Sequence, residues 1–158
     1  MSFKNFIYSL TCLSFSIIIG AAIYEHLAVV PQWSAAPPAS LSMLQGEYGL
    51  YAQAFWMPIH PITLVLMILT LLLSWKSPRR VNVAIPLIGY AAILAITFVY
   101  FVPELIAITT TPYADTVDAA LTERAAQWEM LSLVRLGFLI VLSLVLFSGL
   151  TRSNHKRY

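Results

Sequence analysis

The sequence predicts an all-α membrane protein: an antiparallel four-helix transmembrane bundle that forms one domain over residues 1–158. Two observations carry this prediction. Hydrophobic residues make up 59% of the chain and charged residues only 10%, whereas charged residues are about a quarter of an average soluble protein. The apolar residues also form four runs, each near the length of about 20 residues that a helix needs to cross a bilayer. A soluble globule and a disordered chain are therefore excluded, and no nucleic-acid-binding motif is present.

Four spans are predicted in order along the chain. The first covers about 6–30 and ends at Pro31. Its apolar run is longer than that of a signal peptide, so we expect it to remain in the protein. The other three cover about 55–75, 81–103 and 128–150. The turn between the second and third spans is tight, which makes these two spans antiparallel neighbours.

Two longer loops join the spans at the opposite end. In the first, 31–54, residues 39–53 are predicted to form a short interfacial helix. Four aromatic residues of this region suit the aromatic belt at the lipid headgroups: Trp33, Tyr48, Tyr51 and Trp56. In the second, 104–127, Asp115 or Thr116 is predicted to cap a helix with Asp118 in its first turn. That helix is expected to continue into the fourth span.

The charges predict the orientation. Seven of the nine basic residues lie at the end that holds both termini and the tight turn: Lys4, Lys76, Arg79, Arg80, Arg152, Lys156 and Arg157. All seven acidic residues belong to the other half. The positive-inside rule therefore predicts a multi-pass protein of the inner (plasma) membrane with both termini in the cytoplasm.

Ionisable residues gather in the outer third of the predicted spans: Glu25, His26, His60, Glu104, Glu129 and Arg135. Such residues are costly within a membrane and by default indicate function. Each span also has one polar stripe at helical spacing, and we expect the stripes to face inward and form an outward-facing pocket. A buried Arg135 needs an anionic partner, for which Glu25 is the first candidate and Glu104 the second.

Three chemistries remain open for this pocket. The ligand types of a non-haem iron, copper or zinc site are supplied by His26, His60, Glu104 and Glu129. Alternatively, His26 and His60 would hold a non-covalent b-type haem, and both alternatives require these two imidazoles to approach one another. Without a cofactor, a buried group with a shifted pKa would act as a general base. The catalytic candidates are His60, Glu25, Arg135 and Tyr100.

Each of these residues also has a structural interpretation. His60 precedes Pro61 and would then cap the second span, while Glu104 and Glu129 would be interfacial. The polar stripes would hold helices together, and the protein would be a non-enzymatic membrane subunit or scaffold. A transporter is disfavoured because the cytoplasmic two-thirds of the spans is almost purely apolar. The expected partners are the lipid bilayer and a hydrophobic small molecule, and the oligomeric state stays open.

Several motifs resemble those of one family. They are Gly20–His26 with Pro31 and Trp33, Phe55–Pro61, Trp75 with Arg79 and Arg80, Thr97–Pro103, and Trp128 with Leu133–Arg135. Over nearly the whole chain they resemble a bacterial family of small four-span membrane proteins related to the anthrone oxygenase-like group. The named activity in fungal relatives is oxygenation of an anthrone to an anthraquinone without an obvious cofactor. The resemblance implies an oxygenase-like or other redox enzyme on a hydrophobic small molecule, and it assigns no catalytic residue.

Overall fold

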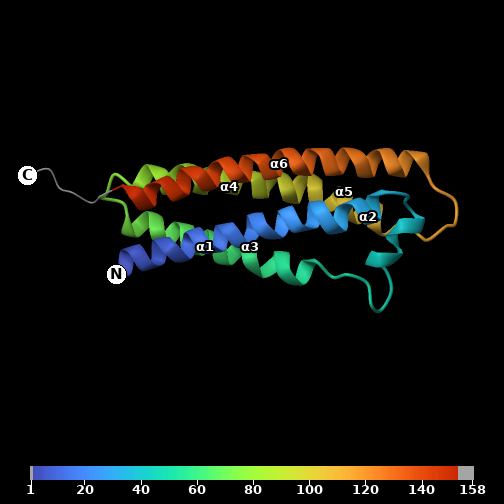
Figure 1. Ribbon diagram of the computed structural model, residues 1–158, viewed down its shortest axis with the longest axis horizontal. Coiled ribbons are helices and arrows are strands. Elements are labelled where there is room, and N and C mark those ends of the chain that lie inside the picture. The colour runs from blue at the N-terminus through green and yellow to red at the C-terminus, as the bar shows by residue number, and fades with distance from the viewer. Residues whose placement is uncertain (1, 153–158) are drawn as a thin grey trace, which may run out of the picture.

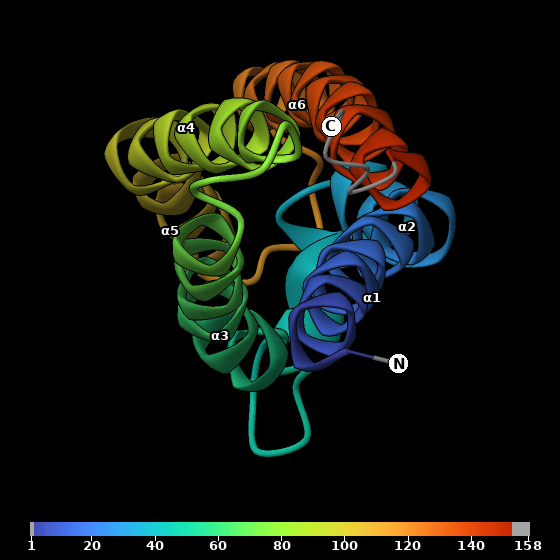
Figure 2. The ribbon, with the colours of Figure 1, turned by 90° about the vertical axis from the view of Figure 1, so that its left-hand side faces the viewer.

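The computed structural model describes residues 2–152, so Lys156 and Arg157 lie outside the described residues. It confirms the predicted all-α fold class. Four helices are long and apolar enough to cross a membrane: Phe3–Ser34, Gln53–Leu73, Arg80–Thr109 and Ala119–Thr151. They stand around a ring in chain order, each antiparallel to the next (Figures 1 and 2). The first helix begins and the last ends at the same end of the bundle. We call it the terminal end and the opposite one the loop end.

The first and third helices each contain one wide, π-helical turn. In the first helix, α1 (Phe3–Tyr24) passes through η1 (Glu25–Val29) into α2 (Val30–Ser34). In the third, α4 (Arg80–Ile96) passes through η3 (Thr97–Phe101) into α5 (Val102–Thr109). Each wide turn is followed directly by the dipeptide Val-Pro. The two helices that run from the terminal end to the loop end therefore share the same feature, a wide turn followed by Val-Pro.

A proline accounts for each wide turn. Pro31 and Pro103 have no N–H, and a proline ring clashes with the carbonyl group four residues earlier in an α-helix. The backbone N–H of the valine before each proline instead reaches five residues back, to the carbonyl of Glu25 or of Thr97. The widened turn relieves the clash. The helices thus continue past the prolines at which the predicted spans end.

The second helix, α3 (Gln53–Leu73), contains Pro58 and Pro61 in its first turns. His60 therefore lies inside the helix, and the expectation that it caps the span is wrong. Only Ala39–Leu44 of the preceding loop is helical, as the short 3-10 helix η2, and the expected helix over 39–53 does not form. Gly46 has a left-handed φ of 80°, which turns the chain away before a longer helix can form.

The last helix, α6 (Ala119–Thr151), is continuous from the loop into the span, as expected. Its cap is Asp118, whose carboxylate accepts the backbone N–H groups of Ala120 and Leu121 at 2.9 and 3.1 Å. The expected caps, Asp115 and Thr116, precede the helix. The Asp115 carboxylate instead accepts a hydrogen bond from the Tyr113 hydroxyl at 2.7 Å.

The bundle buries two apolar clusters. The membrane cluster consists of Tyr8, Cys12, Phe15, Ile18, Met67, Val83, Tyr90, Leu94, Leu139 and Leu146. The loop-end cluster consists of Val30, Trp33, Leu41, Phe101, Ile108, Leu121, Ala125 and Trp128. Trp33 is 3% exposed and packs edge-on against Trp128, so it is a core residue and not the interfacial one expected. Tyr48 and Tyr51, by contrast, are 94% and 65% exposed.

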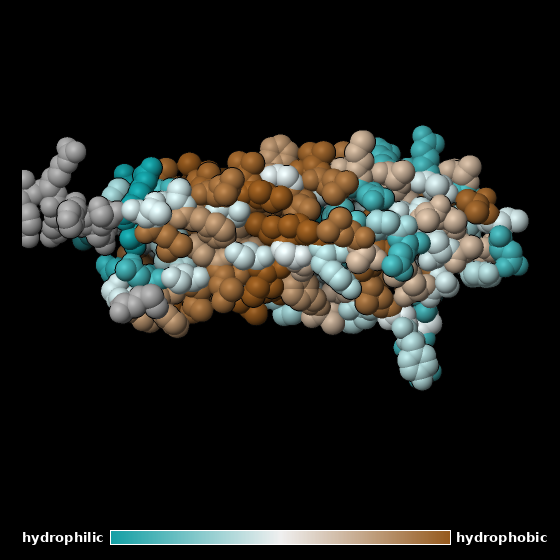
Figure 3. Space-filling model, in the orientation of Figure 1, coloured by the Kyte–Doolittle hydropathy of each residue, from teal (hydrophilic) through white to brown (hydrophobic). Residues whose placement is uncertain are grey.

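Helix lengths explain why there are two clusters. With 21 residues, α3 is about as long as a hydrocarbon core is thick, whereas the other three spanning helices have 30 to 33 residues. All four are level at the terminal end, where the Arg79 side chain donates to Asn5 and to the backbone of Arg152. The three longer helices therefore project beyond α3 at the loop end (Figure 1), and the loop-end cluster fills that projection. On the face shown in Figure 3, a wide apolar band covers the middle of the bundle.

Candidate functional site

A layer of polar side chains lies where the membrane cluster meets the loop-end cluster. All four spanning helices contribute to this polar layer, which we define as Glu25, His26, Trp56, His60, Thr97, Ser132 and Arg135. Both wide turns begin within it, η1 at Glu25 and η3 at Thr97. Wide turns of this kind are frequent at functional sites because they redirect side chains at one level of a helix. The polar layer is therefore the candidate site.

One branch of the layer joins the first three spanning helices. The indole N–H of Trp56 donates to the Glu25 carboxylate at 2.8 Å. One turn further along α3, the His60 ring stacks on Trp56, with 5.4 Å between centroids and 20° between ring planes. His60 Nδ1 in turn shares a hydrogen bond of 2.6 Å with the Tyr90 hydroxyl. Because Tyr90 is only 1% exposed, this bond fixes the imidazole from the inner side.

The other branch is centred on Arg135 of α6. Its guanidinium donates to the hydroxyls of Thr97 and Ser132 at 3.1 and 2.8 Å. It also lies over the Phe101 ring, 4.1 Å from the centroid, a contact that favours a cation. Among the described residues no hydrogen bond or ion pair joins Arg135 to Glu25 or His60, so the two branches meet in one layer without direct contact between their charged groups.

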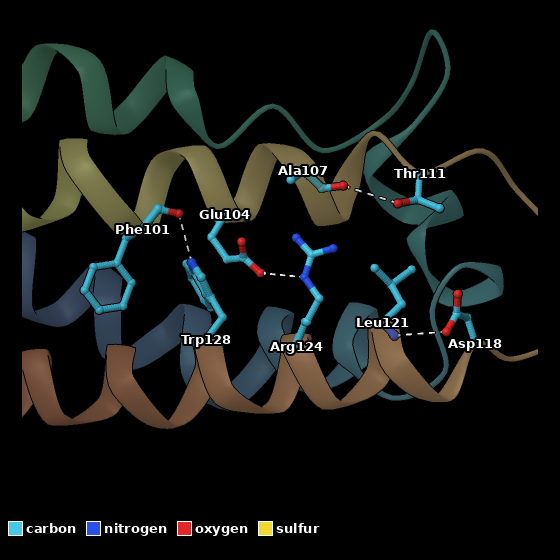
Figure 4. Close-up of polar contacts among 8 residues, drawn as sticks. All are labelled: Phe101, Glu104, Ala107, Thr111, Asp118, Leu121, Arg124 and Trp128. Atoms are coloured by element: carbon cyan, nitrogen blue, oxygen red, sulfur yellow. Dashed lines mark hydrogen bonds and ion pairs between the residues drawn. The ribbon is translucent and has the colours of Figure 1, made fainter.

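The expected salt bridge of Arg135 with Glu25 or Glu104 does not form. In residues 2–152 the one ion pair of acidic and basic side chains joins Arg124 to Glu104, at 2.8 Å (Figure 4). The Glu25 carboxylate is held by the Trp56 indole instead. Arg135 has neutral partners, two hydroxyls and an aromatic face.

The wide turn η3 explains why Glu104 and Tyr100 are displaced. In an uninterrupted α-helix both residues would follow Thr97 on one face. The wide turn inserts about one residue of rotation, so Phe101 takes the inward position and is 5% exposed. Tyr100 is left half-buried beside Phe101, and Glu104 faces Arg124 on α6 (Figure 4). Neither forms a hydrogen bond, ion pair or ring contact with His60, so the structure does not join Tyr100 to the other catalytic candidates.

Glu129 and His26 also lie apart from the main contacts. The Glu129 carboxylate accepts a hydrogen bond from Ser34 at 3.1 Å, at the side of the loop-end cluster. His26 is 9% exposed, and its Nδ1–H donates to the carbonyl of Ala22 at 2.8 Å. Its Nε2 is one of two buried side-chain polar atoms without a hydrogen-bond partner in the described part of the chain; the other is Asn82 Oδ1. His26 Nε2 is thus a buried nitrogen of the polar layer that makes no hydrogen bond in the described part of the chain.

The residues present do not fit a metal site. Within residues 2–152, no three or more His, Cys, Asp or Glu side chains are grouped so that they could hold a metal ion. His60, Glu104 and Glu129 each bind a different neighbour, namely Tyr90, Arg124 and Ser34. The two imidazoles predicted for a b-type haem are also engaged separately: His60 stacks on Trp56 and shares a hydrogen bond with Tyr90, while Nδ1 of His26 bonds to the Ala22 carbonyl of its own helix. The predicted ligand set is therefore dispersed.

Sequence reasoning assigned no role in the site to its neutral members, although the polar stripes include Trp56, Tyr90, Thr97 and Ser132. The indole of Trp56 and the hydroxyl of Tyr90 hold the two ionisable groups of the first branch, and Phe101 covers Arg135. A signal for Trp56 was present, since it precedes His60 by four residues and a helix places such a pair on one face. Phe101 gave no such signal, because its inward position depends on the wide turn.

Comparison with protein-family models, with curated proteins and with solved structures gives no match. The chemistry of the polar layer is therefore the basis for any functional assignment.

Proposed function

We propose that this integral membrane protein is an oxygenase-like enzyme that acts on a hydrophobic small molecule entering from the bilayer. The polar layer would be its active site, and the loop end would face outward from the plasma membrane. One observation carries the proposal: Arg135 and Glu25 share a partly buried layer with His60 without forming an ion pair with each other. A charge withdrawn from water without a counter-charge is costly, so stability alone does not account for two such charges in one layer.

His60 is the proposed general base. The Tyr90 hydroxyl can donate or accept, so it supports either tautomer of the His60 ring while Trp56 holds the ring plane. In the tautomer that carries its proton on Nδ1, this N–H donates to the Tyr90 hydroxyl and Nε2 is the nitrogen that can take up a proton. Arg135 lies close enough for its charge to act on His60, and it would stabilise negative charge that develops on the substrate.

The reaction that fits these groups converts a methylene carbon to a carbonyl with dioxygen. His60 removes a proton from an acidic C–H bond, and the electron pair of that bond reduces dioxygen to a carbon-bound peroxide. Loss of the second C–H proton forms the C=O bond while the O–O bond breaks. The departing oxygen takes up protons and leaves as water. Substrate and dioxygen thus yield a ketone and water, and dioxygen is the oxidant.

The test is oxygen uptake by the purified protein with an anthrone as the probe, followed together with the absorbance of the quinone product. We expect uptake above the rate of autoxidation. His60→Gln should lower it by about 100-fold or more, the range for loss of a general base. Tyr90→Phe should lower it less, because it removes only the group that orients the ring. Met57→Leu is the matched control, since Met57 lies on the same helix and is 69% exposed.

Uptake by wild-type protein no faster than autoxidation, or full activity in His60→Gln, would overturn the proposal. Metal analysis and an absorption spectrum of the same preparation complete the experiment. Stoichiometric metal or a haem band, lost in His26→Ala, would contradict the cofactor-free chemistry.

A second candidate function is a non-enzymatic subunit or scaffold, which the rest of the bundle favours. Below the layer, α1 is fastened to α3 by two buried hydroxyl pairs: Thr11 with Thr70 at 2.7 Å, and Ser14 with Thr63 at 2.6 Å. Polar stripes of this kind hold helices together in a bilayer. Full function in both His26→Ala and His60→Ala would leave the scaffold as the remaining explanation.

A further inference from the structure

The turn between α3 and α4 at the terminal end borders an open hollow of about 300 Å³, lined by Trp75, Lys76, Ser77, Pro78 and Arg80. This hollow is far from the polar layer and takes no part in the proposed chemistry. Its lining residues follow directly after the last residue of α3, Leu73, and reach the first residue of α4, Arg80. Trp75, which is 57% exposed, is a residue type that prefers the headgroup region of a bilayer.

Two cations line the hollow without a counter-charge. Within residues 2–152, the side chains of Lys76 and Arg80 form no ion pair and no hydrogen bond. Arg79 between them is different, because its guanidinium is engaged by the Asn5 side chain and the Arg152 carbonyl. Arg79 therefore has a structural role, while Lys76 and Arg80 remain available to a ligand.

The chain supplies no acidic side chain to this end: its Asp and Glu residues are Glu25, Glu47 and five residues between 104 and 129, all of which belong to the other half of the bundle. Within residues 2–152 no anionic group of the protein is therefore placed to pair with Lys76 or Arg80. At this depth the most abundant anion is the phosphate of a phospholipid, and basic pockets on the cytoplasmic side of membrane helices bind such headgroups. The charge distribution predicts that the terminal end is cytoplasmic.

We propose that the hollow is a binding site for the phosphate group of an anionic phospholipid, with Lys76 and Arg80 as its ligands and Trp75 against the glycerol region. The phosphate of the headgroup binds the Lys76 and Arg80 side chains, and the acyl chains lie along the exposed apolar surface of α3. The shared chemistry is a phosphate anion, whose source is the lipid and not free phosphate. The site is independent of the proposed enzymatic function.

The experiment measures lipid binding by the full-length protein in neutral detergent, with phosphatidylglycerol, phosphatidylcholine or inorganic phosphate added. Retained lipid is counted by native mass spectrometry, and the melting temperature is followed in parallel. We expect the wild-type protein to retain phosphatidylglycerol in preference to phosphatidylcholine and to melt at a higher temperature with it. Lys76→Gln and Arg80→Gln should each weaken phosphatidylglycerol binding about fivefold, the effect of one interfacial basic residue, and together about 25-fold.

Lys4→Gln is the matched control, because it removes the same charge from the same end of the bundle but lies outside the hollow. It should bind phosphatidylglycerol as the wild type does. Three results would overturn the proposal: equal retention of the two lipids, an equal loss in Lys4→Gln, or the same stabilisation from inorganic phosphate alone. Melting of each variant without lipid shows whether it is folded, and these exposed positions should leave that temperature unchanged.

Discussion

Two arginines of α6 show how differently one residue type is accommodated at two depths. Arg124 projects from the first turns of the helix, where its side chain is 45% exposed and meets the Glu104 carboxylate at 2.8 Å. Arg135, three turns deeper, is enclosed by two hydroxyls and the Phe101 ring. Water screens the first charge, and polarisable neutral groups accommodate the second.

The Arg124–Glu104 ion pair should therefore contribute little to stability. Exposed pairs are worth less than about 1 kcal/mol because solvent screens them and holding two long side chains costs entropy. Arg124→Gln is expected to lower the free energy of unfolding by no more than that, and high salt should reduce the difference further. Unfolding titrations in mixed micelles at two salt concentrations check this. A loss of 3 kcal/mol or more, about the value for a buried pair, would show that Glu104 lies deeper than we describe.

At the level of single residues, the sequence predicts the depth of the ionisable members of the layer but not the side chains that they contact. Glu25, His60 and Arg135 follow from their depth along apolar helices, because depth depends only on counting residues. Their partners depend on helix rotation, which the wide turns alter. The pairing of Arg135 was consequently misjudged.

Helix rotation is set by the Val-Pro dipeptides that follow Glu25–Val29 and Thr97–Phe101. Each proline follows a wide turn that relieves the clash of its ring with the preceding backbone. Beyond that turn, the side chains are rotated by about one residue relative to an uninterrupted α-helix. The position of a proline can be read from the sequence. Whether the helix ends, kinks or widens there depends on packing against its neighbours, which is why the predicted ends at Pro31 and Pro103 differ from the structure.

The contact of α1 with α6 at the terminal end offers a test at the level of elements. A Cβ atom at Gly149 would collide with the Tyr8 hydroxyl and would lie 2.9 Å from Asn82 Cβ. That hydroxyl donates to the Leu146 carbonyl at 2.6 Å. Gly149→Ala should therefore destabilise the protein by about 1–3 kcal/mol, the usual cost of overpacking.

Gly137 on the same helix is the control, because a Cβ there meets nothing within 4 Å. Gly137→Ala should be neutral or stabilising by up to about 1 kcal/mol, since alanine favours the helix more than glycine does. Thermal unfolding of both variants in detergent compares them. Equal behaviour of the two would contradict the close packing of α1 against α6.

For the whole molecule, the fold class follows from properties that average over many residues. Low charge and four apolar runs predict a four-span bundle, and this prediction is confirmed. The projection of three helices beyond α3, with a second apolar cluster inside it, was not predicted. Residues such as Trp33 and Trp128 suit either a headgroup belt or a core, and only the lengths of the neighbouring helices distinguish the two. The cytoplasmic location of both termini stays a prediction from the basic residues.

The central claim is that the polar layer is maintained for chemistry and not for stability. The most direct test is the free energy of unfolding of Arg135→Leu, measured by equilibrium titration in mixed micelles beside the wild type. Because Arg135 has only neutral partners, we predict a loss below about 2 kcal/mol, the upper range of a desolvated cation–π contact. A loss of about 3–5 kcal/mol, the cost of breaking one side of a buried ion pair, would show that Arg135 holds the bundle together and would contradict the account.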